Sequence, residues 1–296
     1  MSGDVISGAA EVVELDHGVQ EFAAQGVEKA ERAMLQLPQA DCPVVHRFGP
    51  GIYIREVFLK AGTLAIGHHQ NFAHINTVLY GRVQMVKEDK STVEVKGPCT
   101  FVGQPGRKIG YVLEDTLWQN VYATNIRDIA TLEAMYLTKS IDWYAAMAEK
   151  HHEDQDQNEP VRKDFFRMLG EYNILAETAR GQSENQLDQC SMPDGEWCFK
   201  IDNSGIQGVG VFLSAPMSAG MVVGPARTSG LRTPLGRYVN HSPTPNAVMR
   251  KDMMGDIDLV LLRNVAGCAG GANGEEVTID YRQALGLSGL PRKGIE

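Results

Sequence analysis

Between about residue 46 and residue 124 the sequence breaks into short alternating apolar and polar segments, with turn residues about every ten positions. One segment covers residues 53–59 and ends at the turn Lys60-Ala61-Gly62. Alternation with a period of two places successive side chains on opposite faces of a strand. Short strands with regular turns favour an all-β sandwich or barrel. The other predicted strands are residues 77–80, 82–86, 92–95, 100–102, 108–113 and 118–122.

Helical periodicity flanks this β region. Helices are predicted over residues 8–37, 128–150 and 161–179, with Ser140 as a cap inside the second. Residues 151–160 are polar and acidic without a period, which indicates a linker and a domain boundary. We expect a mainly β, multi-domain α+β protein. Its predicted parts are a helical segment (1–45), a β-barrel (46–127), a helical connector (128–182), a second domain (190–285) and a tail (286–296).

One stretch of the predicted barrel keeps the spacing G-x5-H-x-H-x3-E-x6-G, with Gly62, His68, Gln70, His74 and Gly81 at its fixed positions. This spacing resembles the first motif of the cupins, which are double-sheet β-barrels. Glutamine and histidine replace two of the three metal ligands of that motif. In the second cupin motif, Gly110 stands at the position of the histidine.

The resemblance therefore extends to the fold more than to the metal site. Alternation places His68, Gln70 and His74 on one face, where His68 and His74 are the candidate metal ligands. A stable metal site usually needs three or four protein ligands. We expect a barrel kept for its shape, for assembly or for substrate positioning. A metal bound by His68 and His74 is the alternative.

Three blocks in the last third of the chain follow one another in a defined order. They are G-V-G-V-F at residues 208–212, R-Y-V-N-H-S-P-T-P-N at residues 237–246 and G-E-E-V-T-I-D-Y at residues 274–281. Their order and spacing resemble the SET-domain protein-lysine methyltransferases over about residues 196–285. That resemblance implies a fold of small sheets in which one segment threads under a loop as a pseudoknot.

The same resemblance implies the site residues. Gly208, Val209, Gly210, Arg237, Asn240 and His241 stand at positions where the family binds S-adenosylmethionine. Tyr281 stands where the family has the tyrosine that aligns the amine with the methyl group, and Tyr238 stands at a wall of the lysine channel. The expected function is methyl transfer to a lysine presented by a protein substrate. Glu275, Glu276 and Asp280 alternate with apolar residues, so we expect them to hydrogen-bond structurally.

The chain departs from the family in its cysteines. Pro243 replaces a cysteine of the second block, and no cysteine follows Cys268, so the cysteine-rich closing segment of many members is missing. The helix around residues 165–172, Trp197 or a second subunit would have to close the site instead. The combination of a cupin-like barrel with a minimal SET domain resembles proteins of bacteriophages.

Composition excludes several other classes. The net charge is −9, and residues 200–296 hold 10 basic and 8 acidic residues, which leaves 18 against 29 in the rest of the chain. This balance disfavours nucleic acid as a partner, because phosphate binding needs clustered positive charge. The five scattered cysteines lack a C-x-x-C pair and predict no disulfide framework. No apolar run is long enough to span a membrane. We expect a cytoplasmic protein, located in the host cytoplasm if a phage encodes it.

Two other functions stay open at this point. One is a non-catalytic assembly or binding protein that keeps both folds, and the other is a metal-dependent cupin enzyme. A homodimer is a further expectation. The substrate lysine and the number of methyl groups are not encoded in these motifs.

Overall fold

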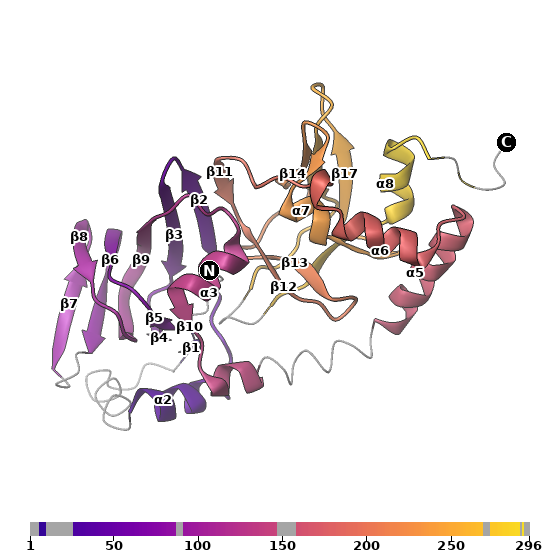
Figure 1. Cartoon of the computed structure of the whole chain (residues 1–296). Helices are drawn as coiled ribbons and strands as arrows, with labels where there is room; N and C mark the ends of the chain where they lie inside the picture. The colour runs from indigo at the N-terminus through magenta and orange to yellow at the C-terminus, as the bar shows by residue number, and fades with distance from the viewer. Residues whose placement is uncertain are drawn as a thin grey trace. The chain divides into compact units, whose positions relative to one another are not determined.

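The computed structural model describes residues 6–9, 26–86, 91–146, 158–268, 273–290 and 292. The protein is mainly β with helices, as predicted, and divides into two compact units (Figure 1). Unit 1 comprises Met1–Ala148, Asp194–Cys198 and Gly267–Gly274, and unit 2 comprises Glu149–Pro193, Phe199–Ala266 and Glu275–Glu296.

Unit 1 is built on a nine-stranded antiparallel sheet. Its main path runs β1-β4-β9-β3-β2-β11, and β6 pairs with β7, β8 and β9. A two-stranded sheet joins β5 and β10. The strands are β1 (Ile6–Ala9), β2 (Val44–Gly49), β3 (Ile52–Leu59), β4 (Thr63–Ile66), β5 (His69–Gln70), β6 (His74–Val86), β7 (Thr92–Lys96), β8 (Cys99–Gly103), β9 (Ile109–Ala123), β10 (Leu137–Thr138) and β11 (Gly195–Trp197).

Two strands of this sheet are longer than the sequence predicts. The segments expected at residues 77–80 and 82–86 form the single strand β6, and those at 108–113 and 118–122 form β9. Gly81 lies between the first two segments with φ +96°, and the register between β6 and β9 shifts around it. The left-handed glycine therefore bends the strand without ending it.

Apolar side chains from these strands form the core of unit 1. Val57, Val78, Val112 and Trp118 belong to one buried cluster, in which Val78 and Val112 are fully buried. Burying a side chain of this size stabilises the fold by about 1.5–3 kcal/mol. A second cluster packs Ala30 and Met34 of a helix against the sheet.

That helix, α2 (Val27–Met34), is shorter than predicted. Of the helix expected over residues 8–37, Gly8 and Ala9 lie in strand β1, and residues 10–25 lie outside the described part. Arg107 donates two hydrogen bonds to the fully buried carboxylate of Glu31, at 2.6 and 2.8 Å. This bidentate pair fixes α2 to the loop before β9.

The connector also departs from prediction. The segment 128–150 forms α3 (Ile129–Tyr136), then β10, then a helical stretch at residues 141–146, whose Trp143 amide donates to the Ser140 side chain as expected. The helix predicted over residues 161–179 is two helices, α5 (Glu159–Glu171) and α6 (Ala176–Glu184). Asn173 between them has φ +53°, a left-handed conformation that ends a helix.

Unit 2 contains two four-stranded sheets. Their orders are β12-β13-β19-β16 and β15-β14-β18-β17. Its strands are β12 (Phe199–Asn203), β13 (Val209–Leu213), β14 (Val222–Thr228), β15 (Leu231–Arg232), β16 (Asn240–His241), β17 (Ala247–Lys251), β18 (Ile257–Leu261) and β19 (Glu276–Ile279), and its further helices are η1 (Gln186–Asp188), α7 (Pro234–Tyr238) and α8 (Tyr281–Leu287). Residues 194–198 extend the sheet of unit 1 through β11, although they fall in the range predicted for the second domain.

Gly81 offers a test of the β6–β9 pairing. A Cβ at this position would lie 2.4 Å from the Asp115 carbonyl oxygen and 2.5 Å from Thr116 Cα, so the backbone would have to move. We expect Gly81→Ala to lower the free energy of unfolding by about 3 kcal/mol, from overpacking and left-handed strain together. Gly51→Ala is the matched control, because Gly51 has φ +71° and open space around it. It should cost only about 1 kcal/mol. Equal losses of unfolding free energy in the two variants, measured by urea denaturation, would contradict the close approach of Asp115 and Thr116 to Gly81.

Candidate functional site

The predicted cofactor loop and Asn240 lie against each other in unit 2. The Asn240 side-chain amide is within hydrogen-bond distance of Ser204 Oγ (3.0 Å), the carbonyl oxygens of Gln207 (3.2 Å) and Val209 (3.0 Å), and Glu276 Oε1 (2.7 Å). One amide group therefore joins the loop before β13 to strand β19. The three residues 207–209 are exposed, which leaves this part of the loop open to a ligand.

The two glycines of the loop have different physical roles. Gly208 has φ +56°, which favours glycine, and a Cβ there would meet no atom within 4 Å. At Gly210 a Cβ would lie 2.1 Å from Glu276 Oε1, the oxygen that accepts from Asn240. Gly210 is thus required for the internal packing of the loop, whereas Gly208 faces open space.

The second and third sequence blocks meet as a parallel strand pair. Asn240 is opposite Thr278 and His241 is opposite Ile279. The Ser242 amide donates to the Ile279 carbonyl oxygen at 2.9 Å and continues the pairing. The site residues on β16 are therefore held directly beside the strand that leads to Tyr281.

Asn246 fastens the end of the second block to β19. Its Oδ1 accepts from the Thr278 amide at 2.8 Å, and its Nδ2 donates to the Glu276 carbonyl oxygen at 2.8 Å. The residue is 1% exposed, so both bonds are shielded from water. The side-chain amide accepts from and donates to the β19 backbone, as a paired strand would. This role needs both an acceptor and a donor, which an asparagine amide has.

Tyr281 begins helix α8 at the end of β19. Its hydroxyl donates to the Val239 carbonyl oxygen at 2.9 Å, and its backbone amide donates to His241 Nδ1 at 3.2 Å. Phe165 of α5 packs edge-on against the ring, with centroids 6.0 Å apart. Burial raises the pKa of Tyr281 to about 12, so the phenol keeps its proton at neutral pH.

His241 is fixed by bonds on both ring nitrogens. Because Nδ1 accepts from the Tyr281 amide, Nε2 carries the proton and donates to Asp164 Oδ2 at 3.0 Å. Arg282 donates to the same oxygen of Asp164 at 2.7 Å and to Glu171 Oε2 at 2.6 Å. The hydrogen bond from Arg282 lowers the pKa of Asp164. These three charged residues position His241, and through it the start of α8.

Sequence reasoning missed Asp164, Glu171 and Arg282. Only Asp164 carried a signal, as an acidic residue beside Phe165 on the apolar side of a predicted helix. Phe165, on the helix expected around residues 165–172, contacts both His241 and Tyr281. That this helix closes the site stays a prediction. The carboxylates of the third block are structural in this geometry, because Glu276 also accepts from Ser204 Oγ and Asp280 caps α8.

Arg237 and Tyr238 lie on α7, immediately before β16. The Arg237 guanidinium stacks over the Tyr238 ring, 4.9 Å from its centroid, and donates to Gln189 Oε1. Thr233 caps this helix by accepting from the Gly236 amide at 3.3 Å. α7 therefore positions Val239, whose carbonyl oxygen accepts the hydrogen bond from the Tyr281 hydroxyl. Arg237 contacts Tyr238 in the same helix and Gln189 outside it.

The predicted metal ligands lie in unit 1. His74 Nδ1 donates to the Phe72 carbonyl oxygen at 3.0 Å, and Nε2 accepts from Asn120 at 3.1 Å. Both nitrogens are thus engaged by the protein, and burial lowers the pKa of the ring. Within the described ranges no group of three or more His, Cys, Asp or Glu side chains is placed to hold a metal ion. With both ring nitrogens of His74 engaged, this geometry does not fit a metal ion held by His68 and His74. Metal binding by these two histidines stays a prediction.

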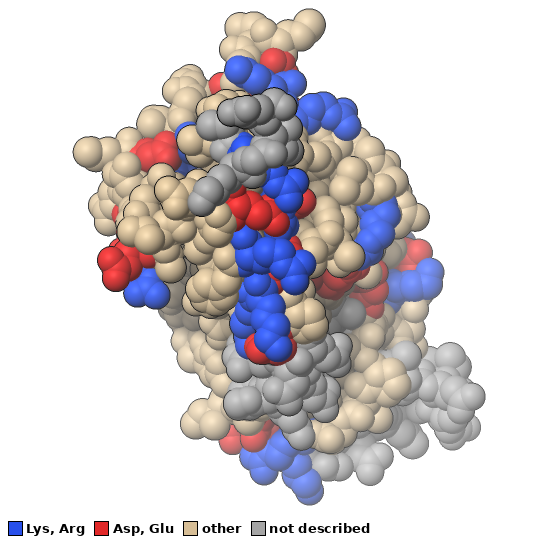
Figure 2. Space-filling model, turned by 90° about the vertical axis from the view of Figure 1, so that its right-hand side faces the viewer, with Lys and Arg blue, Asp and Glu red and all other residues tan. Residues whose placement is uncertain are grey.

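On the face shown in Figure 2, basic side chains gather along the middle, with acidic side chains among them. In the part of the chain that the structure describes, no helix is both long and apolar enough to cross a membrane.

No protein-family model and no curated protein sequence matches the chain. Among solved structures, an RmlC-like cupin protein with a double-stranded β-helix fold from Methanocaldococcus jannaschii is 17% identical, covering 29% of this chain and 83% of its own, with a TM-score of 0.24. A cupin-2 domain protein from Shewanella frigidimarina is 13% identical (36% and 99% covered, TM-score 0.24), and the Clostridium difficile EutQ protein is 16% identical (28% and 68% covered, TM-score 0.23). Similarity of this extent and score does not establish the family of the chain.

The Asp164–Arg282 pair predicts how stability depends on pH. The pKa values of Asp164 and Glu171 are lowered from their ordinary 3.8 and 4.5 by hydrogen bonds from Arg282. Depressed carboxyl pKa values contribute stability above the unfolded values, and that stability is lost as pH falls through the folded ones. We therefore expect the melting temperature to fall between about pH 5 and pH 3.

Asp164→Asn should reduce this acid dependence and lower the free energy of unfolding by about 2–3 kcal/mol at pH 7. This loss is smaller than that from breaking a fully buried ion pair, because Glu171 still accepts from Arg282. Glu184→Gln, at an exposed position of α6, is the control and should change neither quantity. Thermal melts followed by circular dichroism test this. An unchanged acid transition in Asp164→Asn would refute the assignment.

Proposed function

We propose that unit 2 transfers a methyl group from S-adenosylmethionine to a lysine amine of a protein substrate. The observation that carries the proposal is the convergence of three separate sequence blocks: the Gly208 loop, Asn240–His241 and Tyr281. Hydrogen bonds join each block to the next, through Asn240 to the loop and through His241 to Tyr281. Fixed placement of groups contributed by distant segments is what an alignment-dependent reaction requires.

The loop fits a bound cofactor in two respects. Residues 207–209 are exposed, and the open space beside Gly208 allows a ligand to approach the backbone closely. The residues that would hold S-adenosylmethionine are Gly208, Val209 and Gly210 of the loop and Asn240, which bonds the loop. The resemblance adds Arg237 and His241. The cofactor supplies a methyl group activated on a sulfonium sulfur.

The side chain of Tyr281 suits the other half of the reaction. Its proton is committed to the Val239 carbonyl oxygen, so the hydroxyl oxygen still has lone pairs that can accept from an approaching amine. The transfer would form a nitrogen–carbon bond as the carbon–sulfur bond of the cofactor breaks, and the proton lost from the lysine ammonium would pass to water. The amine must be neutral to attack, and a site shielded from water lowers the pKa of a lysine. Phe165 and the half-buried Tyr281 ring provide apolar surroundings for that step.

The alternative is that both units are non-catalytic and serve assembly or binding. Asn240, Asn246 and Glu276 all make internal hydrogen bonds, as they would in a scaffold. Equilibrium binding of S-adenosylmethionine by the full chain separates the two functions. Binding at micromolar concentration supports the enzyme, and a folded chain that does not bind it supports the scaffold.

Gly208 provides the binding test. Gly208→Ala places a methyl group in the open space beside the loop, and we expect it to weaken S-adenosylmethionine binding at least about tenfold, or about 1.4 kcal/mol. Gly220→Ala is the matched control, since Gly220 is exposed, has φ +81° and also faces open space. The two variants carry similar backbone strain. Equal calorimetric affinities for the cofactor would contradict the role of the loop.

Tyr281 provides the catalytic test. Tyr281→Phe removes the hydroxyl, and we expect methyl transfer to fall about 10²-fold, as when one well-placed polar group is lost from an active site. Tyr172→Phe is the control, because its hydroxyl also donates to a backbone carbonyl oxygen of unit 2, that of Arg282 at 3.2 Å. Transfer of labelled methyl groups to lysines of a host lysate, located by mass spectrometry, is the measurement. Full activity in Tyr281→Phe would remove it from the mechanism.

A further inference from the structure

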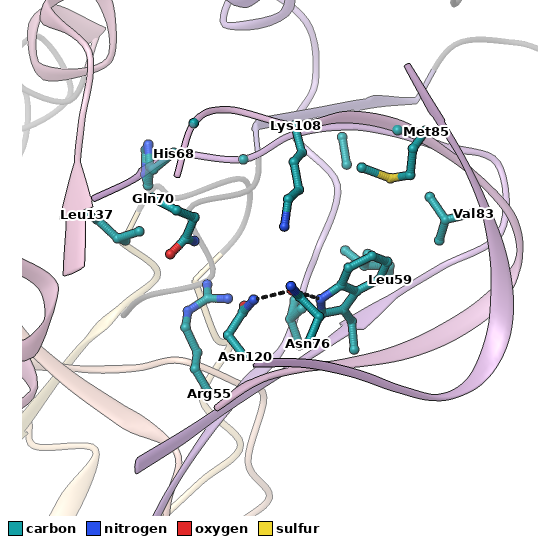
Figure 3. A pocket seen from close by; sticks show the side chains of 16 residues that line it. Arg55, Leu59, His68, Gln70, Asn76, Val83, Met85, Lys108, Asn120 and Leu137 are labelled. Atoms are coloured by element: carbon teal, nitrogen blue, oxygen red, sulfur yellow. Dashed lines mark hydrogen bonds between the residues drawn. The ribbon is translucent and has the colours of Figure 1, made fainter. Parts of the chain in front are cut away.

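A cavity of about 110 Å³ lies inside unit 1, lined by side chains from β3, β4, β6 and β9 and from neighbouring loops (Figure 3). One part of its wall is apolar and includes Leu59, Val83 and Met85. The other part is polar and includes Arg55, Asn76 and Lys108. The described lining contains two cationic side chains and no carboxylate.

Lys108 enters this cavity from the start of the segment that leads into β9. Figure 3 shows its side chain extending across the cavity toward Asn76 and Asn120. Burial lowers the pKa of the ammonium group. Lys108 is half-buried, and no carboxylate is among the described residues that line the cavity around it. A cation kept in such surroundings costs free energy unless an acceptor compensates it.

Asn76 supplies a second donor at the same place. The residue is fully buried, and its Oδ1 accepts from Trp118 Nε1 and from Asn120 Nδ2, both at 2.9 Å. Since both partners are donors, the amide orientation is fixed and Nδ2 points the other way. This Nδ2 has no hydrogen-bond partner in the described structure. A buried donor without an acceptor costs free energy.

These two donors lie near each other. A Cβ built on Gly103 would be 2.2 Å from Asn76 Nδ2 and 2.9 Å from Lys108 Nζ, so both nitrogens flank one point. The guanidinium of Arg55, which is 6% exposed, lies in the same wall and adds positive charge. The arrangement calls for a compact acceptor with negative charge.

We propose that this cavity binds a small carboxylate, whose oxygens accept from the Lys108 ammonium and the Asn76 amide while a short apolar tail packs on Leu59, Val83 and Met85. The volume is somewhat below the roughly 150 Å³ of apolar cavities that hold benzene, so the ligand has about four to six non-hydrogen atoms. The apolar wall disfavours a strongly hydrated dianion such as phosphate, and the two cations disfavour a metal ion. This site is independent of the methyl transfer proposed for unit 2.

Butyrate is the probe, titrated into the full chain by isothermal calorimetry. We expect one site per chain with Kd below about 1 mM, and at least tenfold weaker binding of butyramide, which has a similar size and no charge. Inorganic phosphate should bind more weakly than butyrate. Equal affinities for butyrate and butyramide would overturn the proposal. So would a folded chain that binds no butyrate at a concentration 10-fold above the expected upper limit of Kd.

Two variants locate the site. Lys108→Met keeps the length of the side chain without its charge, so we expect butyrate affinity to fall at least tenfold while the melting temperature does not fall. Lys60→Met, at an exposed turn, is the control and should bind as the parent chain does. Unchanged affinity in Lys108→Met would place the ligand elsewhere.

Asn76→Asp tests the same geometry from within the protein. One carboxylate oxygen would still accept from Trp118 and Asn120, and the other would accept from Lys108 in place of the ligand. We expect this variant to lose butyrate binding without a loss of melting temperature. Retained butyrate affinity in a folded Asn76→Asp chain would refute the carboxylate site, even if Lys108→Met failed to fold.

Discussion

The short parallel pairing of β16 with β19 is the constraint on which the candidate site of unit 2 depends. Only two residues of β16 take part, and a ladder of that length is not stable by itself. Side chains complete it: Asn246 bonds the backbone of β19, and His241 accepts from the amide of Tyr281. Because these groups are buried, leaving any of them unpaired would cost about 1–3 kcal/mol, which holds the two strands in one register.

Buried charge has opposite consequences in the two units. In unit 2 the Arg282 guanidinium has Asp164 and Glu171 as acceptors within the protein, so it fixes the position of His241. In unit 1 the Lys108 ammonium enters a cavity whose described lining has no acid. A charge compensated inside the protein maintains a geometry, whereas a charge left for an external acceptor favours binding of a ligand. The candidate site of unit 2 and the carboxylate site proposed for unit 1 follow from this same electrostatic rule.

Local signals predicted much of the fold, and their failures have physical causes. Between residues 46 and 124, alternation located β3, β6, β7, β8 and β9, but it did not predict β2, β4 or β5. The Ser140 cap was found from its residue type. The strand predicted to end near Gly81 continues, because pairing with β9 outweighs the local preference for a turn. The helix predicted over residues 161–179 breaks at Asn173, where an ordinary polar residue takes a left-handed conformation that its neighbours in sequence do not reveal.

The sequence by itself determined which residue types are available to the candidate sites: the loop glycines, Asn240, His241 and Tyr281, and the substituted ligand positions of the barrel. Short motifs encode these because backbone conformation and strand pairing act over a few residues. The tertiary structure alone decided that Asp164 and Arg282, 118 positions apart, share hydrogen bonds, and that Lys108 faces Asn76. Such pairs depend on which strands and helices pack together, and the free energy of that packing is a property of the whole core that no local pattern records.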